Sequence, residues 1–229
     1  MTPHAIRVTI LDDHQSIIDG YIYRLSTFNG IEVVATIRYG EDLEPTLTVH
    51  PTDVLLLDIN VPASADNPNP YPILYDISNL LQKYPNLNIL VISMFAERSL
   101  IKAVMEAGAS GYVLKDDQAT IRDLANVVAS VAHGGVYFSQ KAHKLFLKNQ
   151  RIDDNAPLTP RQLEALSLCA AYPNATTAHL AGKMSVSNST VRNLLSGAYL
   201  RLGVPNRTAA IEKARQLGLI TPHSPAPSM

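Results

Sequence analysis

The sequence predicts a doubly wound α/β domain with a five-stranded parallel sheet, followed by a small all-helical domain. Short apolar runs alternate with helical stretches through residue 138, and beyond Leu158 only helical periodicities occur. Charge divides near the same place, since residues 1–140 carry 8 Lys and Arg against 16 Asp and Glu, and residues 141–229 carry 11 against 4. An acidic half joined to a basic half favours a polyanion partner for the second half alone. The alternative is that the charges are distributed by chance between two solvated surfaces.

The strands of the sheet are expected, in chain order, at Ile6–Leu11, Ile31–Ile37, Asp53–Ile59, Asn88–Ser93 and Gly111–Leu114. Three of these runs are continuously apolar, which is typical of parallel strands buried on both faces. Between them, apolar side chains at helical spacing predict covering helices, as in Leu100, Ile101 and Val104 ahead of a stop at Gly108. A domain of this kind binds its ligand at the carboxyl ends of the strands.

We expect the α/β domain to span residues 1–138, a linker 139–157, the helical domain 158–220 and a disordered tail 221–229. The single cysteine, Cys169, excludes an intrachain disulfide and suits a reducing compartment. Neither a bilayer-spanning run nor a signal peptide is visible. The expected location is therefore the cytoplasm, with no membrane partner.

Polar residues stand at the predicted strand ends. Asp12 and Asp13 follow the first strand and Asp58 ends the third, so the strand order 2-1-3-4-5 would bring three carboxylates into one pocket. Such a cluster needs a cation, and its hard oxygen ligands suit Mg²⁺. Ser93 and Lys115 end the fourth and fifth strands at the same edge. A hydroxyl and an ammonium facing a metal-bound carboxylate form a site for a phosphoryl group, with the carboxylate as nucleophile.

Each of these residues alone has an ordinary explanation, because an Asp at a strand end is more often a helix cap or a turn former. The five together, each at its own strand end, favour the phosphoryl site. His14 is expected to cap or pack at the start of the first helix, with no chemical role.

Residues 4–138 resemble the receiver domain of two-component response regulators. The motifs are Leu11-Asp-Asp-His14, Asp58-Ile-Asn-Val-Pro62, Ile92-Ser-Met94 and Ala107-Gly-Ala-Ser-Gly-Tyr-Val-Leu-Lys-Asp116. The last run, with Asp-Asp-His, is similar to the NarL/FixJ subfamily. The resemblance implies a flavodoxin-like receiver whose Asp58 accepts a phosphoryl group from a sensor histidine kinase.

The same resemblance implies that Asp13, Asp58 and the backbone carbonyl of Asn60 hold Mg²⁺, with Asp12 helping through water.

It further implies that Ser93 and Lys115 bind the phosphoryl oxygens. Tyr112 would be an aromatic switch that turns inward when Ser93 moves towards the phosphate. The alternative for Tyr112 is an ordinary aromatic side chain at a strand edge.

One segment departs from the receiver pattern. Residues Ala63–Pro72 are an insertion, and its prolines at alternate positions favour an extended loop over a helix. Because the loop follows Asp58, it could cover that residue, slow phosphoryl exchange or shape partner choice. A tolerated surface insertion is the alternative.

The second half contains the signals of a helix-turn-helix. Thr159 as N-cap and Pro160 at the first helical position open a helix. A short helix is expected at Ala178–Met184, and after a turn at Ser185-Val186 a longer one starts with Ser187 as its cap. Two helices joined by a tight turn, the second beginning with small polar residues, are the helix-turn-helix arrangement, in which the second helix would lie in the major groove of DNA.

Residues 158–220 resemble the LuxR-type DNA-binding domain. The matches are Leu158-Thr-Pro-Arg161 with Glu164, Ser187-x-x-Thr-Val-Arg192, Leu202-Gly-Val204, Asn206-Arg-Thr208 and Leu217-Gly-Leu-Ile220. The resemblance implies that a homodimer binds double-stranded DNA, with the helix after Asn206 at the dimer contact. Carried over by position, the DNA-binding residues are Asn188, Ser189, Thr190, Val191, Arg192 and Leu195.

The recognition helix has departures of its own. Leu194 and Leu195 stand where the family carries polar residues, and Gly197 costs the helix about 1 kcal/mol relative to Ala. Fewer phosphate-binding side chains predict weaker affinity for DNA. The remaining cations available for DNA are Arg192, Arg201, Arg207 and Lys183.

Two functions stay open at this point. The favoured one is a transcriptional regulator that binds DNA under the control of phosphorylation at Asp58. The alternative is a phosphorylation-independent or protein-binding adaptor built from the same two domains. An aspartyl phosphohydrolase is disfavoured, because Asn60 stands where that enzyme needs a general acid. The chain is therefore not expected to be an enzyme.

Overall fold

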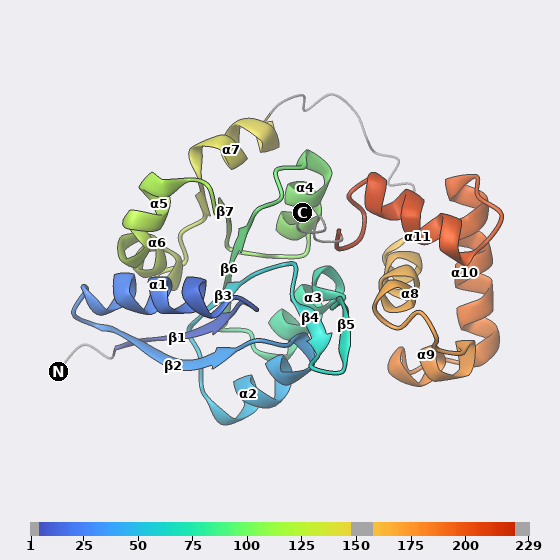
Figure 1. Ribbon diagram of the computed structural model, residues 1–229, viewed down its shortest axis with the longest axis horizontal. Coiled ribbons are helices and arrows are strands. Elements are labelled where there is room, and N and C mark those ends of the chain that lie inside the picture. The colour runs from blue at the N-terminus through green and yellow to red at the C-terminus, as the bar shows by residue number, and fades with distance from the viewer. Residues whose placement is uncertain (1–4, 148–157, 223–229) are drawn as a thin grey trace.

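The computed structural model describes residues 5–147 and 158–222, which form an α/β domain and a helical domain side by side (Figure 1). The strands are β1 (Ile6–Leu11), β2 (Ile31–Ile37), β3 (Val54–Leu57), β4 (Pro62–Ser64), β5 (Asn67–Pro70), β6 (Asn88–Ser93), β7 (Gly111–Leu114) and β8 (Tyr137–Phe138). The α/β domain adds a 3₁₀ turn, η1 (Gly40–Asp42), and α1 (Gln15–Ser26), α2 (Leu43–Val49), α3 (Ile73–Lys83), α4 (Arg98–Glu106), α5 (Gln118–Arg122), α6 (Leu124–Ala132) and α7 (Gln140–Leu147).

The main sheet is parallel, with the order β2-β1-β3-β6-β7-β8. The predicted doubly wound fold is confirmed, and the five predicted strands correspond to β1, β2, β3, β6 and β7. The sixth strand, β8, is too short to show any periodicity in the sequence. It pairs with β7 at Gly111, where a Cβ atom would lie 2.4 Å from the carbonyl oxygen of Tyr137. Only glycine permits this approach.

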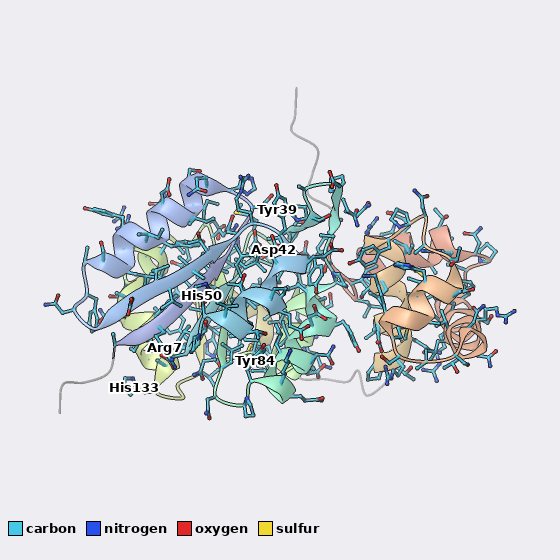
Figure 2. The ribbon with its side chains drawn as sticks, turned by 90° about the horizontal axis from the view of Figure 1, so that it is seen from below. Arg7, Tyr39, Asp42, His50, Tyr84 and His133 are labelled. Atoms are coloured by element: carbon cyan, nitrogen blue, oxygen red, sulfur yellow. The ribbon has the colours of Figure 1, made fainter. Side chains whose placement is uncertain are left out.

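Two apolar layers cover the sheet. One face packs against α2, α3, α4 and α7, and the other against α1 and α6. The central strands are buried on both faces, as β3 shows with four consecutive buried residues. Figure 2 shows Arg7 and His133 at one end of this domain and Tyr39 and Asp42 at the other. The latter end is the carboxyl edge of the strands, because Tyr39 follows β2.

The segment after β8 belongs in part to the α/β domain. The described portion of the predicted linker, residues 139–147, contains α7, which packs against α4 and β7 through the fully buried Ala142. Phe146 of α7 stacks on Phe138 of β8 with a centroid distance of 5.0 Å. Residues 148–157 of the predicted linker lie outside the described residues.

The inserted segment forms a hairpin, β4–β5, rather than an unpaired loop. Pro62 is opposite Pro70 and Ser64 is opposite Asn67. The prediction of extended backbone is correct, but pairing was not expected, because each proline lacks an N–H donor. The Tyr71 N–H donates to the Val61 carbonyl at 2.9 Å and closes the base of the hairpin.

The helical domain consists of α8 (Pro160–Ala171), α9 (Thr177–Lys183), α10 (Asn188–Leu202) and α11 (Arg207–Gln216). The predicted cap at Thr159 is confirmed, and Gln162 completes a capping box with it. Ser185 has φ 52° and makes the turn between α9 and α10, and the Ser187 hydroxyl accepts a hydrogen bond from the Thr190 N–H at 3.1 Å. The predicted helix-turn-helix is therefore present.

The start of the predicted disordered tail is ordered. Thr221 is buried and donates its hydroxyl to the Tyr71 carbonyl at 3.3 Å, so the tail prediction is wrong at this residue. Residues 223–229 lie outside the described part of the chain. Among the helices that the structure describes, none is long and apolar enough to cross a membrane.

Candidate functional site: an acidic pocket and a recognition helix

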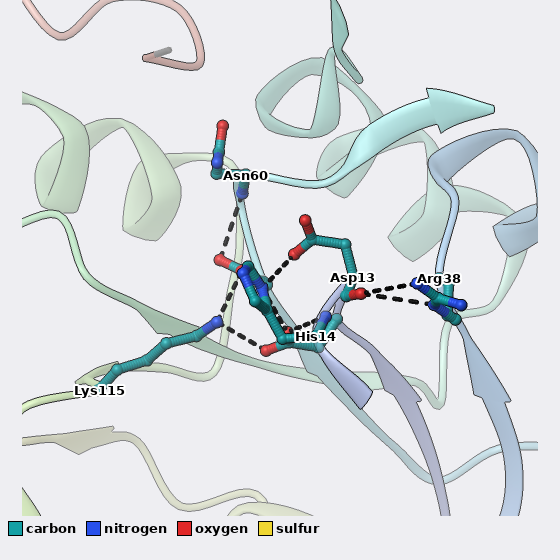
Figure 3. A network of polar contacts seen from close by, with 7 residues as sticks. Asp13, His14, Arg38, Asn60 and Lys115 are labelled. Atoms are coloured by element: carbon teal, nitrogen blue, oxygen red, sulfur yellow. Dashed lines mark hydrogen bonds and ion pairs between the residues drawn. The ribbon is translucent and has the colours of Figure 1, made fainter. Parts of the chain in front are cut away.

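The carboxyl edge of the sheet holds a buried cluster of opposite charges (Figure 3). Lys115 Nζ lies 2.6 Å from Asp12 Oδ2 and 2.7 Å from Asp58 Oδ2. The three side chains come from the ends of β7, β1 and β3, and each is at least nine-tenths buried. One ammonium thus bridges two carboxylates in a pocket of low dielectric, where each charge needs its partner.

Backbone groups also orient these carboxylates. The Asn60 N–H donates to Asp58 Oδ1 at 3.2 Å, and the His14 N–H donates to Asp12 Oδ1 at 3.0 Å (Figure 3). The carbonyl of Asp13 accepts two bonds from the Arg38 guanidinium at 3.3 and 3.4 Å. The first two contacts are local to the loops after β3 and β1, and the Arg38 bonds hold the loops after β1 and β2 against each other.

Burial and charge shift the acidity of the pair. Burial raises the pKa of Asp58 above its ordinary value, and Lys115 offsets this only in part because the Asp12 carboxylate is also close. Burial lowers the pKa of Lys115, but the two carboxylates outweigh it, so the net shift is upward. Lys115 therefore stays an ammonium ion and can neutralise negative charge in the pocket.

Ser93 at the end of β6 and Tyr112 within β7 are buried next to the acidic pocket. Ser93 is fully buried, and its hydroxyl accepts a hydrogen bond from the Phe95 N–H at 3.2 Å. Tyr112 is also fully buried, and its hydroxyl donates to the Phe95 carbonyl at 2.7 Å. The Tyr112 ring thus already points inward, in a core cluster that also contains Ala142 of α7.

The acidic residues suit a hard divalent cation. Asp12, Asp13 and His14 bring potential ligand atoms within 4.8 Å of one another, and His14 Nδ1 lies 2.7 Å from Asp13 Oδ1. Asp58 adds a third carboxylate from the neighbouring strand, so a Mg²⁺ ion would find oxygen ligands and would neutralise clustered negative charge. The residues present fit such an ion.

The buried face of α10 contains two residues that the sequence-based prediction left exposed for contact with DNA. Val191 is fully buried and Leu195 is 5% exposed, and both belong to the core of the helical domain with Ala198. Their predicted contact with DNA is therefore wrong. The spacing of four and then three residues explains why, because positions 191, 195 and 198 share the face of α10 that packs against α8 and α9.

The opposite face of α10 is polar and exposed. Asn188, Thr190 and Arg192 are exposed, as predicted for residues that contact DNA, whereas the Ser189 side chain lies outside what the structure describes. Asn193 and Ser196 are exposed on the same helix, and the prediction missed both. Helical spacing could have found them, since Asn193 lies three positions after Thr190 and Ser196 lies four positions after Arg192. The helix contains no Asp or Glu.

Packing within the helical domain explains two residues of α10 that differ from the family pattern, Leu194 and Gly197. Leu194 packs against the core of the helical domain, which accounts for an apolar residue there. Gly197 faces Gln162 of α8, whose Nε2 would lie 2.6 Å from an added Cβ atom. Gln162 is held by the Thr159 cap and by Arg201, so glycine lets α8 and α10 approach.

Two of the other cations that were predicted to be available for DNA, Arg207 and Lys183, make contacts within the helical domain. The Arg207 guanidinium donates to the carbonyls of Ala175 and Tyr172, both at 2.9 Å, and so joins α11 to the end of α8. Lys183 Nζ lies 4.0 Å from the centroid of the Tyr172 ring. Arg192 remains the exposed cation at the start of the recognition helix.

Comparison with known families agrees with these two sites. The family described as response regulator receiver domain matches residues 8–126, which is more than half of the chain. The family described as bacterial regulatory proteins, luxR family, matches residues 156–214.

Full-length relatives share both domains. The transcriptional regulatory protein DegU of Brevibacillus brevis is 29% identical over 239 residues, covering 95% of this chain and 96% of its own. The transcriptional regulatory protein DesR of Bacillus subtilis is 28% identical, covering 93% and 98%. Both are named as transcriptional regulators rather than as enzymes.

Solved structures match the same arrangement. RcsB from Salmonella enterica serovar Typhimurium, bound to promoter rprA in the presence of the phosphomimetic BeF₃⁻, aligns with TM-score 0.62 at 23% identity, covering 92% of this chain and 98% of its own. A structure of two RcsB dimers bound to two parallel DNAs aligns with TM-score 0.55 at 24% identity, with the same coverage. This chain belongs to the response regulators, and it joins a receiver domain to a LuxR-type helix-turn-helix in the NarL/FixJ arrangement.

Proposed function

We propose that this protein is a cytoplasmic, DNA-binding transcriptional regulator controlled by a sensor histidine kinase. The observation that carries the proposal is the ammonium of Lys115 between the buried carboxylates of Asp12 and Asp58 at the carboxyl edge of the sheet. The relatives named as transcriptional regulators over nearly the whole chain support it.

Asp58 is the proposed phosphoacceptor. One of its carboxylate oxygens attacks the phosphorus of the kinase's phosphohistidine, the P–N bond breaks, and the histidine leaves with the electron pair. Lys115 is close enough to neutralise a phosphoryl oxygen, and Ser93 lies at the end of the neighbouring strand. Mg²⁺, held by Asp13, Asp58 and the Asn60 carbonyl with Asp12 nearby, would neutralise charge on the transferred group.

The exposed face of α10 is the proposed DNA contact. Arg192 and Asn193 offer the side chains that pair with guanine and adenine in the major groove. Asn188, Thr190 and Ser196 would complete the polar face. Val191 and Leu195 instead hold the helix in place from the core.

A homodimer is the proposed DNA-binding form, because two recognition helices about 34 Å apart can read two half-sites of one DNA. The dimeric RcsB structure with DNA supports this assembly. The exposed side of α11, with Thr208 and Glu212, is available for the contact between subunits.

The first test measures DNA binding with and without acetyl phosphate and Mg²⁺, on sequences selected from a random pool. Wild type is expected to bind more tightly after phosphorylation, whereas Asp58→Asn is expected to lose that response. Asp116→Asn is the matched control, because Asp116 is an exposed carboxylate beside Lys115 that pairs with Lys141.

Each outcome separates the candidate functions. Sequence-specific binding whose affinity changes neither with acetyl phosphate nor in Asp58→Asn would favour the phosphorylation-independent regulator. An absence of specific binding in every state would reject the DNA-binding function and favour the protein-binding adaptor.

A further inference from the structure

The inserted hairpin β4–β5 is joined closely to the phosphoacceptor. Between Asp58 and the hairpin, Ile59 and Val61 are at most 1% exposed, and Ala63 within β4 is fully buried. The Asn60 N–H donates to Asp58 Oδ1 at 3.2 Å in the same segment. Alternate residues of this short segment are therefore anchored in the core, which links the backbone at Asp58 to the hairpin.

The base of the hairpin is fixed to the receiver. The Tyr71 N–H bonds to the Val61 carbonyl at 2.9 Å, and β4 lies against η1. The ring of Tyr71 covers Gly40 so closely that a Cβ atom there would lie 2.0 Å from a ring carbon. The base of the hairpin is therefore attached both to the segment that follows Asp58 and to η1, which follows β2.

The other end of the hairpin contacts the helical domain. Asn67 Nδ2 donates to the carbonyl of Ala171 at 3.0 Å. Ala171 is the last residue of α8, and carbonyls at the end of a helix have no partner within it. Asn67 Oδ1 accepts hydrogen bonds from the Asn69 N–H and Nδ2 at 3.3 and 2.7 Å, which orient the amide. The hairpin thus supplies a C-terminal cap to a helix of the other domain.

Further hydrogen bonds join the two domains beside the hairpin. The Tyr172 hydroxyl donates to Glu41 Oε1 at 2.7 Å, and Thr221 donates to the Tyr71 carbonyl at 3.3 Å. Further along the interface, a cavity of about 270 Å³ separates α3 and α4 from α8, between Leu74 and Leu163. Around this cavity α3 contacts α8 and Gly218 closely approaches Ser99 of α4, so the hairpin region is one of several specific contacts between the domains.

The contacts with the hairpin leave the recognition helix uncovered. They reach the end of α8 and the turn after it, while Arg192 and Asn193 of α10 stay exposed (Figure 1). Docking therefore sets where the helical domain sits relative to the receiver, without blocking the face proposed to bind DNA.

We infer that the β4–β5 hairpin is the docking surface through which the phosphorylation state of Asp58 controls the position of the helical domain. This inference rests on the proposed function. The bonds from Asn60 and Lys115 are made by the two carboxylate oxygens of unmodified Asp58, one to each. A phosphoryl group on either oxygen rearranges them, shifts the anchored segment and weakens the contact between Asn67 and α8. Linkage makes the effect reciprocal, so releasing the contact favours modification of Asp58.

The test uses the full chain and small-angle X-ray scattering, with and without BeF₃⁻ and Mg²⁺. Wild type is expected to shift towards extended molecules when BeF₃⁻ binds. Asn67→Ala is expected to shift the ratio of extended to docked molecules about fivefold before any BeF₃⁻ is added, because one hydrogen bond is lost. Tyr172→Phe, which removes the bond to Glu41, should act in the same direction. Asn86→Ala, an exposed asparagine elsewhere on the receiver, should match wild type.

The second readout is the affinity for BeF₃⁻, followed by ¹⁹F nuclear magnetic resonance. Asn67→Ala should bind BeF₃⁻ more tightly, by a factor no larger than its shift in docking. An Asn67→Ala protein that matches wild type in both scattering and affinity would overturn the docking role. Failure of wild type to bind BeF₃⁻ would instead reject the proposed phosphoacceptor, and the scattering of Asn67→Ala without BeF₃⁻ would still decide the docking role.

Discussion

Replacing Lys115 by Met is expected to lower the free energy of unfolding of the receiver by about 3–5 kcal/mol at neutral pH. The side chain of Lys115 is 8% exposed and its ammonium bridges Asp12 and Asp58, so its loss leaves two buried carboxylates facing each other. Urea unfolding of the full chain, monitored by circular dichroism, measures the loss.

The matched control is Lys141→Met, because Lys141 pairs with Asp116 at 3.1 Å and both side chains are more than half exposed. An exposed pair of this kind contributes about 0–1 kcal/mol. Equal losses in the two variants would contradict the central place of Lys115 in the pocket.

The pH dependence of the Lys115→Met loss provides a further check. The pKa of Asp58 is already raised by burial in the wild type, and removal of Lys115 raises it further. In Lys115→Met, protonation of Asp58 then stabilises the folded state relative to the unfolded one. This stabilisation is fully present below the ordinary carboxyl pKa and is lost as the pH rises through the raised pKa of Asp58 in the folded protein. The deficit of Lys115→Met should therefore shrink on acidification from neutral pH, and also on addition of Mg²⁺. A deficit that ignores both would exclude repulsion between the carboxylates as its cause.

Leu195→Ala is expected to destabilise the helical domain by about 2–5 kcal/mol, because Leu195 is 5% exposed in a core shared with Val191. Arg192→Ala, three positions earlier on the exposed face, should leave thermal unfolding unchanged and weaken binding to specific DNA by about 1–3 kcal/mol. Differential scanning calorimetry and a DNA titration separate the two effects.

The opposite result for Leu195→Ala would support the sequence-based prediction that Leu195 contacts DNA. If Leu195→Ala left the unfolding transition unchanged but abolished DNA binding, Leu195 would be a DNA contact after all. Ser196→Ala is a useful companion, since it removes a hydroxyl from the exposed face without disturbing the core.

Several features of this protein could be read from the sequence alone. Continuous apolar runs such as β3 are buried on both faces, and this predicts a parallel sheet before any coordinates are known. Parallel strands end at one edge, so Asp12, Asp58 and Lys115 could be brought together from topology alone. The cap at Thr159 was predictable for a different reason, since it depends only on residues close in sequence.

Contacts between distant segments were decided by the tertiary structure. The rotation of α10 depends on packing against α8 and α9, so family position alone placed Val191 and Leu195 on the wrong side. The pairing of the proline-rich insertion and the capping of α8 by Asn67 join residues that no local pattern links. Caps follow from short-range rules and the strand order is typical of the doubly wound fold, whereas the docking of two domains depends on surfaces that exist only after each has folded.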